Sequence, residues 1–208
     1  MRGDPVTSDV VPGGTPPFDE VLRRQRMVRP PYVDAPVPDD VLRVVLDAGG
    51  RAPSAGFTQG VSFLVLRGDE TRVVWEVTWP AEGGAPPEAP VVVLPLESKA
   101  AYLARYAEED KAGAFPDEQA WPAPYWTVDC AFATMTVLLA ATAYGLGAWF
   151  FAIPQRERDL LDALGVPMEW RAIGAITLGV RPADAPRQGS VLTRPKRSFD
   201  DRVRFGRW

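Results

Sequence analysis

The sequence predicts a single domain that mixes α-helices with β-strands. Its 208 residues suit one large domain or two small ones, and neither a repeat nor a shift of composition marks a boundary. Hydrophobic residues make up 46% and charged residues 24%, as in a globular protein with a packed core. Segments with helical spacing alternate along the chain with short apolar runs. We therefore expect residues 15–208 to form one domain.

The first fifty residues contain two predicted helices. Residues 1–14 are polar and rich in glycine and proline, so we expect a disordered leader, and they lack the apolar core of a signal peptide. Thr15 can cap the first helix, which should continue to Arg29 because two prolines follow it. A second helix starts near Pro38, carries acidic residues in its first turn and ends at Gly50.

The middle of the chain contains two predicted strands. Residues 52–60 form a loop of small residues, and the apolar runs 61–66 and 89–96 are predicted strands. The second run is continuous, which is typical of a strand buried on both faces. The segment 71–79 is ambiguous, because its β-branched residues favour a strand and its spacing favours a helix. A helix is expected over 99–106.

A long helix is predicted near the C-terminal third of the chain. It covers 125–144 and ends at a glycine-rich turn. The elements after it are a strand over 148–153, a helix over 155–164 and a strand over 170–180. The tail, 181–208, is basic and has little apolar periodicity, so we expect it to need a partner surface to be ordered.

No charged residue occurs between Cys130 and Ile153. By length alone this run could span a membrane. Its threonines, its glycine break and the predicted switch from helix to strand favour instead a core helix or a helix at a dimer interface. We therefore expect no membrane partner, and a small membrane protein that spans at 130–153 stays the alternative.

Charge and residue usage exclude several kinds of chemistry. The formal net charge of −4 argues against a nucleic-acid partner, which would need a basic face. Without histidine the chain cannot build a Ser-His-Asp triad or a histidine-bearing zinc site, and we expect no metal. The single cysteine, Cys130, cannot form an intramolecular disulfide and is expected to be a small core residue. A cytoplasmic enzyme of this composition would rely on carboxylates or on a bound organic cofactor.

Three segments and one aromatic set could build a site. The run 23–29 is either a solvated basic face or a phosphate cradle, because arginine forks bind phosphate oxygens in pairs. The loop 51–60 is either a plain connection or a place where a flat ligand approaches the backbone, with Ser54 and Gln59 as hydrogen-bonding groups. The tail is either solvated or a second source of cations. The aromatic set, which is either core or the wall of a flat-ligand site, is Trp121, Tyr125, Trp126, Trp149 and Phe150.

Five segments follow one another in a characteristic order. They are Arg26-Met27-Val28-Arg29 with Pro36-Val37-Pro38 after it, the loop from Arg51 to Gln59 (R-A-P-S-A-G-F-T-Q), the long helix and strand from Asp129 to Phe151, the strand from Ile173 to Gly179, and the basic tail. In this order they resemble the R-x-x-R element, the A-P-S-x-x-x-x-Q loop, the central helix, the last core strand and the returning arm of the nitroreductase family. The resemblance covers about residues 18–208.

The resemblance implies a fold and an assembly. The fold would be α+β, with a central, mainly antiparallel sheet and helices on both faces. Two subunits would form an intertwined homodimer through the long helix and exchange their C-terminal arms, 181–208. FMN would lie in each of two pockets at the interface. NADH or NADPH would be the co-substrate.

The resemblance also implies which residues bind FMN. Phosphate and ribityl would contact the N-terminal element and the tail, the loop would reach the flavin of the other subunit, and a backbone N–H after the long helix would face flavin N5. The cofactor-binding residues would be Arg26, Val28, Arg29, Pro53, Ser54, Ala55, Gln59, Phe150, Phe151, Ala152, Lys196 and Arg197.

The expected reaction is a ping-pong exchange in which the flavin carries electrons from NAD(P)H to a flat conjugated acceptor, a nitroaromatic or a quinone. No side chain is expected to be catalytic. Residues 99–126 would form a lid that selects the acceptor through Tyr102, Arg105 and Trp126. The family often has Asn at the position of Phe57 and a Glu-Gly pair at Ala152-Ile153, and these departures bear on the substrate range. Alternatives are a flavin-dependent dehydrogenase or tailoring enzyme of a biosynthetic pathway, and a flavin-binding protein without turnover.

Overall fold

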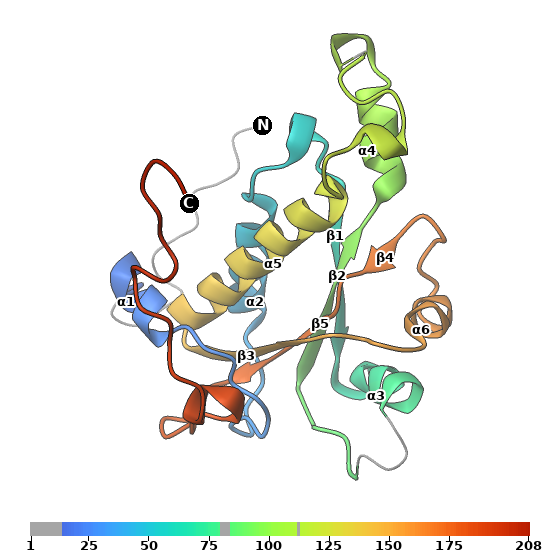
Figure 1. The fold of residues 1–208 in the computed structure, drawn as a ribbon. Helices are drawn as coiled ribbons and strands as arrows, with labels where there is room; N and C mark the ends of the chain where they lie inside the picture. The colour runs from blue at the N-terminus through green and yellow to red at the C-terminus, as the bar shows by residue number, and fades with distance from the viewer. Residues whose placement is uncertain (1–13, 80–83, 112) are drawn as a thin grey trace.

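A five-stranded antiparallel sheet forms the centre of the protein, in a computed structural model that describes residues 14–79, 84–111 and 113–208 (Figure 1). The strands are β1 (Val61–Arg67), β2 (Val91–Glu97), β3 (Leu146–Phe151), β4 (Arg171–Ala172) and β5 (Ala175–Val180). Their order is β1-β2-β5-β3, and β4 pairs with the end of β2. Except for Gly14, the predicted leader lies outside the described residues.

Helices cover both faces of this sheet (Figure 1). They are α1 (Phe18–Arg24), α2 (Asp39–Gly50), α3 (Arg72–Thr78), α4 (Lys99–Tyr106), α5 (Tyr125–Ala143) and α6 (Glu157–Ala163). Alternate side chains of β2 point to opposite faces. Val91 and Val93 belong to the core under α2 and α5, whereas Val92 and Leu94 belong to the core under α3 and α6. All of β2 is therefore buried, and the predicted α+β class with an antiparallel sheet is confirmed.

The long helix α5 is the central helix of the fold. It packs against α2 and the sheet, and Cys130 on it is fully buried, as predicted. By length and composition alone α5 could cross a membrane, with 44% of its most apolar window buried in the structure. The uncharged run, however, continues into β3, whose residues pair with β5 along their whole length. The predicted switch from helix to strand is confirmed, and the run 130–153 is not one continuous span.

The first helix is shorter than predicted. It starts at Phe18 and ends at Arg24, so the prediction of a helix to Arg29 is wrong. After Arg24 the backbone forms a hydrogen bond to the sheet in place of helical ones: the Val28 amide donates to the carbonyl of Ala148 at 2.7 Å. Val28 is also only 5% exposed, so its burial favours the same extended path of the chain.

The structure resolves one ambiguous segment and changes two predicted boundaries. The ambiguous segment 71–79 is the helix α3, whose Trp75 is buried against the sheet. The strand β3 begins and ends two residues before the predicted range 148–153. The predicted strand 170–180 is divided into β4 and β5 at Gly174, where φ is +155°. A Cβ at Gly174 would lie 2.5 Å from the carbonyl oxygen of Phe151, so only glycine fits this break.

Candidate functional site

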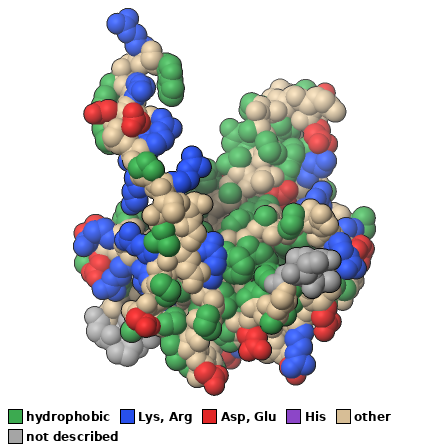
Figure 2. Space-filling view, turned by 60° about the horizontal axis from the view of Figure 1, so that its bottom comes forward, with side chains coloured by type: hydrophobic (Ala, Val, Ile, Leu, Met, Phe, Trp, Pro, Cys, Tyr) green, Lys and Arg blue, Asp and Glu red, His purple; other side chains and the backbone are tan. Residues whose placement is uncertain are grey.

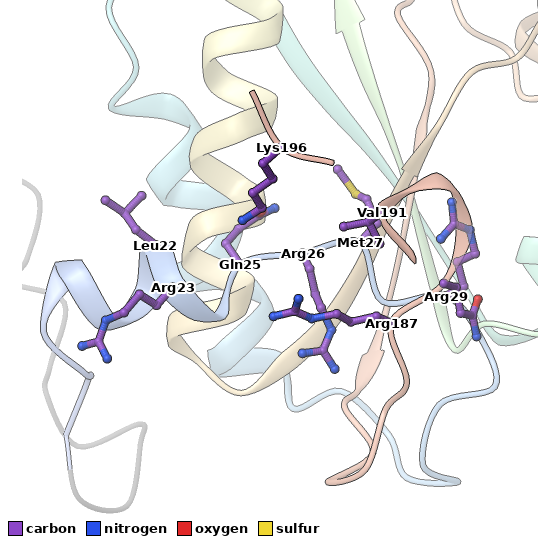
Figure 3. A pocket seen from close by; sticks show the side chains of 10 residues that line it. Leu22, Arg23, Gln25, Arg26, Met27, Arg29, Arg187, Val191 and Lys196 are labelled. Atoms are coloured by element: carbon purple, nitrogen blue, oxygen red, sulfur yellow. The ribbon is translucent and has the colours of Figure 1, made fainter. Parts of the chain in front are cut away.

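A cavity of about 610 Å³ lies between α1, the segment that follows it and the tail. Its charged lining residues are all cations, and among the described residues no acidic side chain lines it. The cationic lining residues are Arg23, Arg26, Arg29, Arg187 and Lys196 (Figure 3). Arg23 pairs with Asp19 at 2.8 Å, and the other four cations form no ion pair among the described residues. An anion in the cavity would offset their mutual repulsion. The arrangement therefore suits a phosphate.

Arg26, which lines this cavity, has a buried donor that is not used. Its Nη2 donates to the carbonyl of Ala185, whereas its Nε is buried and has no partner among the described residues. A buried donor without an acceptor destabilises the folded chain by roughly 1–3 kcal/mol. Nearby, burial and the charges of Arg26 and Arg24 lower the pKa of Arg181, a sign of concentrated positive potential. A bound phosphate would reduce this potential.

The segment that carries Arg26 and Arg29 is pinned to the sheet. Besides the Val28 hydrogen bond, the Tyr32 hydroxyl lies 2.9 Å from the Val28 carbonyl and 2.6 Å from Thr177 Oγ1. Burial raises the pKa of Tyr32 well above its ordinary value, so the hydroxyl stays protonated and can donate. Two of the predicted phosphate-binding arginines are thus held on a fixed backbone beside the strand β3.

The aromatic end of β3 lies next to this segment. The Arg29 guanidinium lies 5.4 Å from the centroid of the Trp149 ring, and Trp149 stacks on Phe151 at 4.6 Å. The Phe150 amide donates to Met27 Sδ at 3.4 Å. Of the predicted ring contacts, Phe150 and Phe151 are half-buried and Ala152 is exposed. The structure therefore brings the predicted phosphate and ring segments together.

The predicted loop contacts lie at the other end of the molecule. The loop with Pro53, Ser54, Ala55 and Gln59 adjoins the N-terminal end of α5, while α1 and the cation cavity adjoin its C-terminal end (Figure 1). A helix of 19 residues is about 28 Å long. Within one chain, the loop and the cavity therefore do not meet.

The loop is fixed by contacts to α4 and α5. The Ala55 amide donates to Asp129 Oδ2 at 2.6 Å, and the Arg105 Nε donates to the Gly56 carbonyl at 3.0 Å. Within the loop, the Gln59 amide donates to Ser54 Oγ at 3.1 Å. Its tip, Phe57, is 76% exposed. The loop thus projects outward from a rigid base.

The tail contributes one predicted cation to the cavity and not the other. Lys196 lines the cavity, whereas Arg197 is exposed and donates to the carbonyl of Asp201 within the tail itself. The end of the tail stands away from the body, next to a hollow with a largely hydrophobic floor (Figure 2). The large apolar side chains of the tail are exposed; they are Val191, Leu192, Phe199, Phe205 and Trp208.

Sequence reasoning missed several members of the site, among them Arg187, Gln188 and Asp129. Arg187 lines the cavity, but the tail has too little periodicity for one arginine to be chosen over another. Asp129 holds the loop, and its signal was available: it is the last charged residue before the uncharged run. A lone carboxylate at the start of an apolar helix must find donors when the helix is buried.

The predicted acceptor-binding residues belong to an aromatic cluster over 99–126. Tyr102 is fully buried and donates to Asp129 Oδ2 at 2.9 Å, so it cannot touch an acceptor, contrary to the prediction. Burial, then the hydrogen bond to Asp129, raise the pKa of Tyr102. Trp126 is half-buried beside it, and Arg105 is tied to Asp110 and the loop. Of the three predicted residues, Trp126 and Arg105 are partly exposed and can contact a ligand, whereas Tyr102 is buried.

Comparison with known proteins identifies the family. The model of the nitroreductase family matches residues 22–180, which is more than half of the chain. The chain belongs to the nitroreductase family.

Curated members of the nitroreductase family resemble this one along most of their length. A protein of Archaeoglobus fulgidus named "Putative NADH dehydrogenase/NAD(P)H nitroreductase" is 28% identical over 151 residues, 71% of this chain and 76% of that protein. A protein of the same name from Methanothermobacter thermautotrophicus is 26% identical over 193 residues, 91% of this chain and 86% of that protein.

Solved structures of the nitroreductase family share the fold. A "putative nitroreductase" from Desulfovibrio desulfuricans, solved in complex with FMN, has a TM-score of 0.61 and 26% identity, and the match covers 88% of this chain and 98% of that one. A nitroreductase-fold protein from Bacillus subtilis has a TM-score of 0.68 at 15% identity, with 90% and 98% covered, and shows the fold alone.

Proposed function

We propose that this protein is an FMN-dependent oxidoreductase that takes electrons from NAD(P)H and passes them to a small, flat, conjugated acceptor. Membership of the nitroreductase family supports the flavin and the nicotinamide co-substrate. The names of the two curated relatives and the FMN complex of the Desulfovibrio protein agree with it. The observation that carries the proposal is the cavity lined by four arginines and one lysine.

The residues of the cavity fit the phosphate end of FMN. A phosphate monoester carries close to two negative charges and has three strong acceptor oxygens. Arg26 and Arg29 would bind it from the pinned segment, and Arg187 and Lys196 from the tail. Gln25 and Gln188, which also line the cavity, can donate to ribityl hydroxyls. Arginine forks are suited to such paired contacts with phosphate.

Bound FMN supplies the redox chemistry, so the chain itself need only bind, orient and shield. Trp149, Phe151 and Trp75 form an aromatic stack beside Arg29 that can border a flat ring system. We propose that NAD(P)H and the acceptor occupy the same cleft in turn, with a nitroaromatic or a quinone as the acceptor. Parallel lines in double-reciprocal rate plots would identify this ping-pong order.

We further propose that the site is completed in a homodimer. The loop and the cation cavity lie at opposite ends of α5, so the loop can reach a flavin only in a second subunit. The exposed apolar side chains on α1 and α5 offer a surface for that subunit; they are Phe18, Leu22, Phe132 and Met135. The exposed apolar residues of the tail supply a second contact. Clusters of exposed large apolar side chains are characteristic of interfaces.

The first experiment is an absorption spectrum of the purified protein. Bands near roughly 370 and 450 nm that heat releases as free FMN are expected from the cofactor assignment. Bleaching by NADPH, followed by recovery on adding a quinone, would demonstrate turnover. Bleaching without recovery by any acceptor would favour the flavin-binding alternative. A colourless protein that takes up no added FMN would contradict the proposal.

A pair of variants tests the cavity itself. Arg26→Gln removes one charge and the buried donor, and it should weaken FMN binding by at least about tenfold, because a hydrogen bond to a charged group contributes about 1.5–3 kcal/mol. Arg43→Gln removes the same charge from an exposed position on α2 and should leave the FMN dissociation constant unchanged. Equal affinities for both variants would remove Arg26 from the site.

A further inference from the structure

A buried carboxylate joins the loop to the core. Asp129, in the second turn of α5, is only 4% exposed, and both of its recorded hydrogen bonds end on the same oxygen, Oδ2. One donor is the Ala55 amide at 2.6 Å, and the other is the hydroxyl of the fully buried Tyr102 at 2.9 Å. Within the described part of the chain, Asp129 forms no ion pair.

A buried carboxylate without an ion-pair partner stabilises a core less than an apolar side chain does. Removal of a carboxylate from water destabilises the folded state by several kcal/mol unless strong hydrogen bonds compensate, and an apolar side chain of similar size would avoid this loss. Two neutral donors compensate only partly. The position of Asp129 therefore calls for a role other than packing.

The backbone that Asp129 holds is strained. Directly after Ala55, the chain passes through positive φ at Gly56, and again at Phe57 and Gln59, where φ is +54° and +55°. Positive φ costs a non-glycine residue of order 1–3 kcal/mol and persists only where the surroundings fix it. The charge-assisted bond at Ala55 is the shortest of the contacts that hold this turn to the core.

The strained turn presents the predicted flavin contacts. Ser54 precedes the anchored amide, Gln59 ends the turn, and the Gln59 amide donates to Ser54 Oγ at 3.1 Å. The exposed tip at Phe57 points away from the chain's own core. If the turn relaxed, Ser54, Phe57 and Gln59 would move together, because the hydrogen bond between the Gln59 amide and Ser54 Oγ links the two ends of the turn.

We propose that Asp129 is a positioning residue that holds the 53–59 loop in the strained conformation needed to contact the flavin of the other subunit. This inference rests on the proposed function. Asp129 itself would touch neither FMN nor substrate. It acts through the Ala55 amide, and the bond to Tyr102 fixes the carboxylate for that task.

The test compares two variants of the full-length dimer. Asp129→Asn keeps the size of the side chain and removes its charge, which weakens the bond to the Ala55 amide. Val137→Ala, at a fully buried position of α5 away from the loop, serves as a control that lowers stability by cavity formation. For both, the FMN dissociation constant, the visible band of bound FMN and the thermal midpoint are measured.

We expect Asp129→Asn to weaken FMN binding by about tenfold and to shift the flavin band, which corresponds to one lost charge-assisted hydrogen bond. Val137→Ala should lower the thermal midpoint at least as much while its FMN affinity stays within about twofold. Unchanged affinity and spectrum in Asp129→Asn would overturn the inference. So would equal losses in both variants, since Asp129 would then act only through stability.

A variant on the loop side guards against misfolding. Ala55→Pro removes the donor and leaves Asp129 and Tyr102 intact, and the extended conformation of Ser54 is compatible with a following proline. It should reproduce the affinity loss of Asp129→Asn, and normal affinity here would overturn the inference. If the wild-type protein binds no FMN, the proposed function fails first. If it binds FMN and both Asp129→Asn and Ala55→Pro bind FMN with wild-type affinity, only the role of Asp129 fails.

Discussion

Cys130 and Glu97 lie in the same buried region, and burial affects each in a measurable way. Burial, with a smaller contribution from the charge of Glu97, raises the pKa of the Cys130 thiol to about 12. Almost no thiolate is then present at neutral pH, and the thiolate is the reactive form. We expect iodoacetamide to leave Cys130 unmodified in the native protein and to modify it fully in denaturant. Rapid labelling of the native protein, followed by mass spectrometry, would contradict the buried position.

Glu97 should make stability depend on pH. It is 9% exposed, its Oε2 has no partner among the described residues, and burial raises its pKa above the usual value. Such a group stabilises the fold in its protonated form, and this contribution is lost as the pH rises through the raised pKa. Glu97→Gln should therefore raise the thermal midpoint near about pH 8 by a few degrees and have little effect below about pH 4. A gain that is equal at both pH values would contradict this assignment.

Among the elements, the pairing of β3 with β5 supports the cation cavity through two glycines. Gly147 lies opposite Gly179, and the Tyr32 ring lies over both. A Cβ at Gly179 would come within 2.4 Å of the ring, so Gly179→Ala should displace Tyr32 and with it the Arg26–Arg29 segment. We expect a loss of roughly 1–3 kcal/mol in the free energy of unfolding and weaker FMN binding.

The matched control is Gly50→Ala at the end of α2. A Cβ there meets no atom within 4 Å, so its stability should be unchanged or slightly higher. Urea unfolding curves of both variants provide the comparison. Equal midpoints would show that the Tyr32 ring moves aside without loss.

Sequence signals predicted an element correctly where residues close to its end in the sequence determine that end. The long helix ends at its glycine turn, as predicted, because the signal lies in neighbouring residues. The first helix stops early because of a hydrogen bond between Val28 and Ala148, which are far apart in the sequence. The break at Gly174 likewise depends on the carbonyl of Phe151. Such contacts exist only after the sheet has formed.

The same limit applies to the site. Arg26 and Arg29 could be chosen because they lie in one short motif, and the cavity includes both. Arg187 and Lys196 join them through the course of the tail, which carries no periodic signal. Tyr102 was predicted to contact the acceptor from the lid, yet it is buried beside Trp121 and Trp126, with its hydroxyl donated to Asp129.

At the scale of the whole molecule, the tail should have two separable roles. Removal of residues 187–208 takes away two cations of the cavity and the exposed apolar side chains, so both FMN binding and dimerisation should weaken. The double variant Arg187→Gln/Lys196→Gln should weaken FMN binding by at least about tenfold and leave the dimer intact. Light scattering and FMN titration distinguish these outcomes. A truncated chain that remains a dimer would assign dimerisation to α1 and α5 alone.

The placement of the cavity and the loop at opposite ends of α5 has a genetic consequence. A chain with Arg26→Ala and Arg29→Ala lacks one half of the site, and a chain with Ala55→Pro lacks the other half. When the two weakened chains are unfolded and refolded together at an FMN concentration that fills only intact sites, each mixed dimer contains one site with both halves intact and one with neither. Random pairing should therefore restore about a quarter of the wild-type flavin content. Complementation of this kind is possible only if every active site is shared between two polypeptides.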